Sequence, residues 1–100
     1  MQTNVFRFHI DPGACLEEVE MTLHLAIFAV EGLVGQARIR LDFSYFIDEP
    51  RRVLIADGSN EVGSAVVRVF TNLMLREFGE DAFRVERAPV PRHHAHRSAA

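Results

Sequence analysis

The segment 37–47 is the feature that most constrains how this chain can fold. Its apolar side chains are Ala37, Ile39, Leu41, Phe43, Tyr45 and Ile47, and the residues between them are Arg38, Arg40, Asp42, Ser44 and Phe46. A period of two is typical of a strand with one buried face and one wetter face. The segment therefore predicts a long strand, and a half-wet strand favours an antiparallel or mixed sheet.

The rest of the chain predicts three more strands and two helices. Alternating side chains predict strands at 5–10, 52–56 and 83–86. Asp11 and Pro12 are typical of a helix start, and the apolar spacing that follows predicts a helix over 12–34. The turn and cap residues 57–60 open a second helix, which Gly79 ends.

The order of these elements predicts the fold class. A turn at 48–51 joins the two middle strands as a hairpin. We expect an α+β fold: a two-layer sandwich of the ferredoxin-like βαββαβ pattern, with a four-stranded sheet and both helices on one face. We expect a single domain at 1–88 and a disordered tail containing Pro, His and Arg at 89–100. This order of elements resembles that of RNA binders, amino-acid sensors, metal carriers, acyl-phosphate hydrolases and oligomerisation modules. The fold pattern therefore does not indicate which function the chain has.

Composition narrows the partners that we expect. The 100 residues are 48% hydrophobic and 25% charged, and no apolar run reaches the ~18 residues that a membrane span needs. The N-terminus shows no export signal and Cys15 is the lone cysteine, so we expect a cytoplasmic protein with no membrane partner. The net charge is −3 although all 11 basic residues are arginine, so nucleic acid is not an expected partner of the chain as a whole.

One candidate site lies where the two helices begin. If the first and third strands are parallel neighbours, both helices begin at the same edge of the sheet. The polar residues that could converge there are His9, Asp11, Asp57, Ser59 and Asn60, with Cys15 nearby. Carboxylates and water would suit a divalent cation better than an anion. The simpler interpretation is that these residues cap the helices, because capping explains each residue type.

A second candidate is the open face of the sheet. The basic side chains that we expect there are Arg7, Arg38, Arg40 and Arg84, with His9 and Arg52 beside them. RNA-recognition domains of this fold bind RNA on that face, but they stack bases on aromatic side chains. Here Phe46 is the main exposed aromatic, and Asp42 and Glu86 lie among the arginines. Cross-strand pairs of arginine with carboxylate are the favoured interpretation.

The remaining chemical groups are sparse. His93, His94 and His96 could bind a transition metal, although a flexible tail gives adventitious affinity more readily than a built site. Cys15 has no evident His and carboxylate arrangement around it, so we expect a small hydrophobic residue rather than a nucleophile. No acid–base pair rises above chance, and we therefore expect neither a cofactor nor enzymatic activity.

The first helix has more apolar surface than one contact with a sheet uses. Beside the core-facing residues, Met21, Leu25 and Phe28 form a second stripe at spacings of four and three. Exposed apolar patches of this kind mark interfaces. The sequence therefore favours a non-enzymatic, self-associating accessory module, whose expected partners are a second copy of the chain, in a homodimer, and another protein. The alternatives are a regulatory domain that binds a small ligand or cation, and an RNA-binding module.

Overall fold

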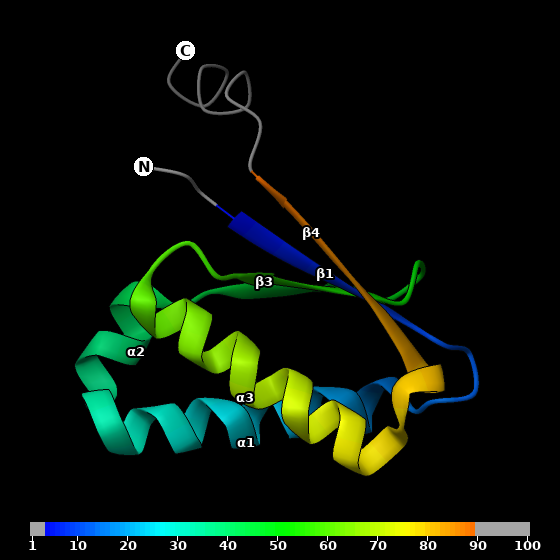
Figure 1. Cartoon of the computed structure of the whole chain (residues 1–100), viewed down its shortest axis with the longest axis horizontal. Helices are drawn as coiled ribbons and strands as arrows, with labels where there is room; N and C mark the ends of the chain where they lie inside the picture. The colour runs from blue at the N-terminus through cyan, green and yellow to red at the C-terminus, as the bar shows by residue number, and fades with distance from the viewer. Residues whose placement is uncertain (1–3, 90–100) are drawn as a thin grey trace.

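The computed structural model describes residues 4–89, which form a sheet of four strands and a layer of helices (Figure 1). The strands are β1 (Asn4–Ile10), β2 (Tyr45–Asp48), β3 (Val53–Asp57) and β4 (Phe83–Pro89). The helices are α1 (Leu16–Val34), α2 (Gln36–Asp42) and α3 (Glu61–Phe78), and a short 3-10 turn, η1 (Glu80–Ala82), leads into β4. The predicted α+β class is confirmed, with α2 as an additional helix.

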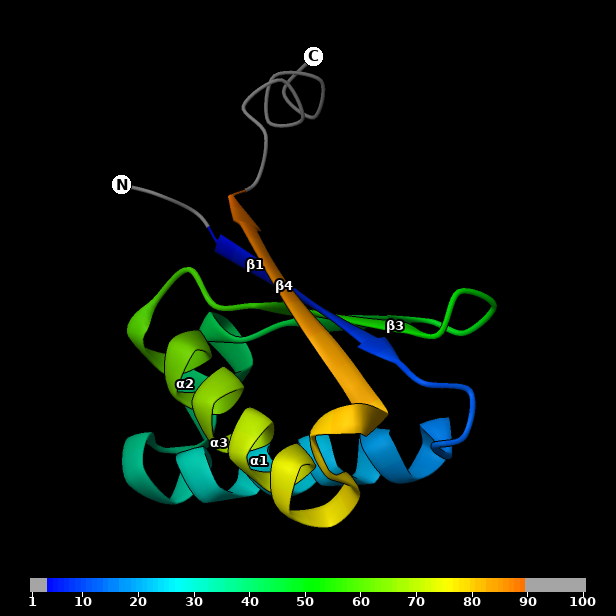
Figure 2. The same ribbon diagram turned by 45° about the vertical axis from the view of Figure 1, so that its right-hand side comes forward.

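The sheet has the strand order β2-β3-β1-β4, and each neighbouring pair is antiparallel. Its register places Phe8 between Leu54 of β3 and Val85 of β4. Figures 1 and 2 show α1, α2 and α3 on the same side of the sheet. The packing is therefore compatible with a two-layer sandwich, in which the described residues leave the other face of the sheet open.

The core lies between the sheet and the helices. Phe8 is fully buried, and its ring meets that of Phe70 on α3 edge-on, with the ring centroids 4.8 Å apart. Leu23 of α1, Leu54 of β3 and Met74 of α3 are fully buried around this pair. Burial of each such side chain contributes about 1.5–3 kcal/mol, so these contacts hold the two layers together.

The predicted strand over 37–47 is wrong in its first half. Residues 36–42 form α2, and only Tyr45–Asp48 form a strand. Of the side chains assigned to the buried face, Ile39 is buried but Leu41 is 84% exposed. An α-helix has 3.6 residues per turn, so alternate residues do not lie on one face.

Local chemistry explains why this segment is helical. Gly35 has a φ of 93°, which ends α1 and redirects the chain into α2. Arg38 and Asp42 are four residues apart and form an ion pair at 3.6 Å, which a helix brings into register. Alternation of three apolar residues within seven is too short a pattern to exclude a helix.

Helix α1 begins at Leu16, later than the predicted start at Pro12. The Asp11 carboxylate accepts a hydrogen bond from the Gly13 N–H at 2.9 Å, so Asp11 stabilises a turn and not the helix start. The Arg52 guanidinium donates to the Asp11 carbonyl at 3.0 Å and to a second carbonyl of the same turn. These bonds satisfy backbone groups of the turn, and the helix starts only after it.

The hairpin and the second long helix are confirmed. β2 and β3 pair as neighbouring antiparallel strands. Asn60 caps α3 by accepting a hydrogen bond from the Gly63 N–H at 2.7 Å, and Gly79, with a φ of 86°, ends the helix. β4 continues through Pro89, so the predicted domain limit at residue 88 falls inside this strand. The rest of the predicted tail lies outside the described residues.

Candidate functional site

Helix α1 carries large apolar side chains on the face that points away from the sheet. Met21, Leu25 and Phe28 are 69%, 57% and 67% exposed. Their spacing places them on one line along the helix. We call these three residues the α1 stripe. They are the residues that the sequence proposed as an oligomer interface, and that role stays a prediction.

The α1 stripe lies opposite the helix face that packs into the core. The buried side chains of α1 are Val19, Thr22, Leu23, Ala26 and Val30. Gly32 follows Phe28 by four residues, and a methyl group added at Gly32 would meet no atom within 4 Å. The line of the stripe therefore ends in open space at Gly32.

The predicted convergence of the two helix starts is wrong. β1 and β3 are neighbours, but they are antiparallel, with Val5 opposite Asp57 and His9 opposite Val53. Asp57 therefore lies beside the start of β1, and Asp11 follows its end. Six residues of strand, roughly 20 Å, separate Asp57 from Asp11. The helix starts are at opposite ends of the sheet and cannot share one cation.

The residues at each helix start are satisfied locally. The Asp57 carboxylate accepts hydrogen bonds from the Ser59 N–H at 3.0 Å and the Ser59 hydroxyl at 2.6 Å. Asn60 caps α3, and its amide donates to the Asp42 carbonyl at 2.7 Å. Cys15 is an exposed free thiol at the start of α1. Helix capping and turn formation therefore account for the polar residues at the start of α3.

No metal centre is found in the part of the chain that the structure describes: no three His, Cys, Asp or Glu side chains lie close enough to hold an ion together. The histidines proposed as transition-metal ligands, His93, His94 and His96, lie outside the described residues.

The open face of the sheet carries fewer arginines than predicted. Arg38 and Arg40 belong to α2, so they are not on the sheet. Arg7 and Arg84 are on strands β1 and β4. This error follows directly from the misassigned strand, and it removes half of the basic side chains on which an RNA-binding face would depend.

The Glu86 carboxylate pairs with two of the basic groups on this face. Glu86 lies 3.9 Å from the Arg7 guanidinium and 3.2 Å from His9 Nε2. Phe46 is 62% exposed, but it lies on β2, an edge strand separated from β1 by β3. The favoured interpretation, that cross-strand pairs neutralise the arginines, therefore describes Arg7 well.

A polar cluster that the sequence did not predict joins β2 to α1. The Tyr45 hydroxyl donates to Glu20 Oε2 at 3.2 Å and lies 3.0 Å from His24 Nε2. Burial raises the pKa of the Tyr45 phenol above its ordinary value, and the hydrogen bond to Glu20 and the charge of Glu20 raise it further. The i,i+4 spacing of Glu20 and His24 was visible in the sequence, but nothing local indicated that Tyr45 would meet them.

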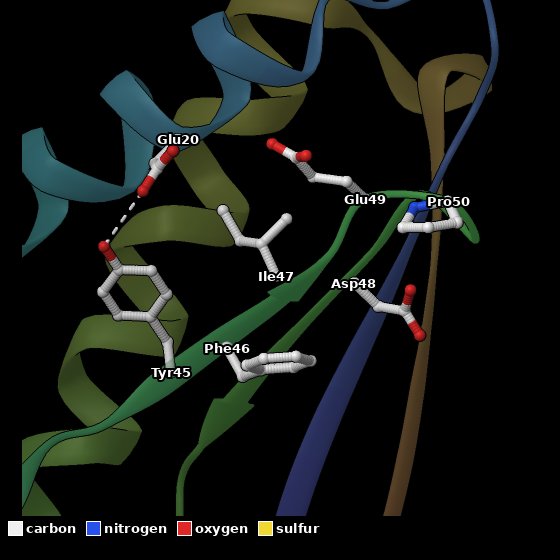
Figure 3. A pocket seen from close by; sticks show the side chains of 7 residues that line it. All are labelled: Glu20, Tyr45, Phe46, Ile47, Asp48, Glu49 and Pro50. Carbon is white, nitrogen blue, oxygen red and sulfur yellow. Dashed lines mark hydrogen bonds between the residues drawn. The ribbon is translucent and has the colours of Figure 1, made fainter.

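A pocket of about 530 Å³ lies beside this cluster, lined by Glu20 and by residues 45–50. Figure 3 shows Tyr45 and Ile47 pointing toward α1, with Glu49 beyond them at the end of the strand. Glu20, Asp48 and Glu49 bring three carboxyl groups to its lining. This lining favours positively charged groups over anions.

No protein-family model, curated protein or solved structure matches this chain. Among residues 4–89, no helix is long and apolar enough to cross a membrane.

Proposed function

We propose that this chain is a non-enzymatic interaction module that binds a second copy of itself through the α1 stripe. The observation that carries the proposal is the exposure of Met21, Leu25 and Phe28 along a single line on the face opposite the core. Contiguous apolar surface of this kind is uncommon on monomers and marks contact sites.

The proposed contact is antiparallel, with its twofold axis near Leu25. In that arrangement Leu25 meets Leu25 of the partner subunit, and Met21 lies near Phe28 of the partner subunit. Burying a large apolar side chain contributes about 1.5–3 kcal/mol, and association costs about 4–15 kcal/mol. Three side chains from each copy therefore suffice for a modest affinity, which suits a reversible module.

The strand order supports a ferredoxin-like class for the fold. β3 lies between β1 and β2, and β1 lies between β3 and β4. Each helical crossover thus connects two strands that have a third strand between them, which is the split βαβ pattern. We also propose a cytoplasmic location, which the exposed free thiol of Cys15 supports because such thiols persist in reducing compartments.

Light scattering on variants tests the α1 contact. Leu25→Lys keeps a good helix former but places like charges at the twofold axis, so it should lower the mass of the assembly. Leu41→Lys is the matched control, because Leu41 is 84% exposed but lies on α2, outside the stripe. The control should keep the wild-type mass. An unchanged mass for Leu25→Lys, with the wild-type circular dichroism spectrum, would reject the α1 stripe as the contact.

A further inference from the structure

Strand β4 has a free edge. Its inner side pairs with β1, and no strand among residues 4–89 pairs with its outer side. Figure 2 shows β4 crossing in front of β1, without a further ribbon of the described chain along it. The backbone N–H and C=O groups of such an edge can bind another strand.

The hydrogen-bonding pattern shows which residues of β4 present these groups. The Asp11 N–H donates to the Ala82 carbonyl at 2.8 Å, so this pair fixes the alternation of the ladder. The backbone N–H and C=O groups of Arg84 and Glu86 bond toward β1. The backbone groups of Phe83, Val85 and Arg87, which we call the outward set, point away from β1. Val85, which is 39% exposed, is the middle of the outward set.

We propose that β4 pairs with β4 of a second copy, antiparallel, with the twofold axis at Val85. In this register Arg84 lies opposite Glu86 of the partner subunit, and the reverse pair forms on the other side of the axis. Opposite charges that face each other across antiparallel strands stabilise the pairing. The outward set supplies about six hydrogen bonds between the two backbones.

Other symmetric registers are disfavoured by charge. A twofold axis at Arg84 would set Arg84 against Arg84 of the partner subunit, and an axis at Glu86 would oppose two glutamates. Charges on an edge strand usually discourage pairing, but here they repel in these registers and attract in the one centred on Val85. Pro89 belongs to the outward set by the same alternation, and its missing N–H ends the pairing there.

The helix side of the sheet is hollowed next to β4. A pocket of about 420 Å³ lies between β4 and α3, with Phe6, Val67 and Val85 in its lining. Arg68 and Arg87 also line it. The proposed register sets Arg87 beside Phe83 of the partner subunit, so it does not bring these arginines against a like charge from the partner strand.

This contact does not depend on the α1 stripe. The stripe faces away from the sheet, and β4 lies at the edge of the sheet, so one chain can make both contacts. A chain that makes both assembles into at least four copies. Loss of the stripe then leaves a dimer held by β4, so the β4 contact is best tested in the Leu25→Lys chain.

Charge reversal tests the register. In the Leu25→Lys chain, Arg84→Glu places glutamate at both positions 84 and 86, and Glu86→Arg places arginine at both. Like charges then face each other across the proposed contact. Each variant alone should have the mass of a single chain. An equimolar mixture should return to the mass of two chains, because the two variants complement each other. The double variant carrying both reversals should also be a dimer.

Sedimentation at low salt provides the readout, since exposed charge pairs are screened by salt. Circular dichroism of each variant confirms that it is folded. A Leu25→Lys chain that is already monomeric overturns the β4 contact while supporting the α1 contact. Charge variants that stay dimeric, or a mixture that stays monomeric, also overturn the proposed register. An unchanged wild-type mass in Leu25→Lys rejects the α1 contact alone.

Discussion

The Tyr45 hydroxyl donates a hydrogen bond to Glu20 Oε2 across 3.2 Å, which ties β2 to α1. β2 is short and pairs on only one side within the described sheet, so this side-chain bond is an additional anchor for it. His24 lies on the same helix and reaches the same hydroxyl at 3.0 Å. The cluster therefore connects the edge of the sheet to the helix that carries the α1 stripe.

The first prediction concerns the ionisation of Tyr45. The chain has one tyrosine and no tryptophan, so an ultraviolet titration reports Tyr45 alone. Its midpoint should lie above the ordinary value of about 10. Glu20→Gln should lower the midpoint but leave it raised, because burial is the largest cause of the shift. A wild-type midpoint at the ordinary value would contradict the hydrogen-bonded arrangement.

The second prediction concerns alkaline stability. The folded pKa of Tyr45 is raised, so its contribution to stability is fully present below the unfolded pKa of about 10 and is lost as the pH rises through the folded pKa. The free energy of unfolding of the wild type should therefore fall relative to that of Tyr45→Phe above this pH. Urea unfolding at several pH values measures the difference, and parallel curves would refute the prediction.

The third prediction compares one substitution in two helices. Gly32→Ala fills open space on α1 and should raise the free energy of unfolding by up to about 1 kcal/mol. Gly63→Ala would place a methyl group 2.2 Å from the Asp57 carbonyl oxygen. The resulting displacement of α3 should cost at least about 2 kcal/mol. Denaturant melts at a fixed protein concentration should show opposite signs; equal effects would contradict the packing described.

The fourth prediction concerns Asn60, which caps α3 and also holds α2 through the Asp42 carbonyl. Asn60→Ala should cost about 1–2 kcal/mol, since it removes both bonds. Asn60→Ser keeps a good capping oxygen but loses the donor to Asp42, and should cost about 0.5–1.5 kcal/mol less than the alanine variant. Thermal melts that place serine and alanine together would show that the cap is unimportant.

The sequence predicted those parts of the fold that depend on local chemistry. The Asn60 side chain is typical of a helix start, and the positive φ of Gly79 is typical of a helix end. Both limits of α3 therefore agree with the prediction. The prediction of one strand over 37–47 was wrong in part because the alternation of apolar residues was the only evidence for it. The positive φ of Gly35 changes the direction of the backbone just before this segment. Whether the residues that follow form a helix depends on tertiary packing around Ile39.

Candidate sites could likewise be located from the sequence where they depend on local spacing, but not where they depend on how strands and helices pack. The spacing of Met21, Leu25 and Phe28 is fixed by the helix, so the stripe could be located from the sequence. The relation between Asp11 and Asp57 depends on the direction of two neighbouring strands, which the sequence did not specify and the antiparallel ladder decides. Tyr45 and Glu20 are 25 residues apart, so their contact appears only once the sheet and α1 have packed.

The sedimentation mass of the wild-type chain from micromolar to millimolar concentration is a direct test of self-association. Self-association is the basis of the proposed function, and its affinity is expected to be modest. The mass should rise with concentration above that of a single chain. A single-chain mass throughout this range would contradict self-association by either surface.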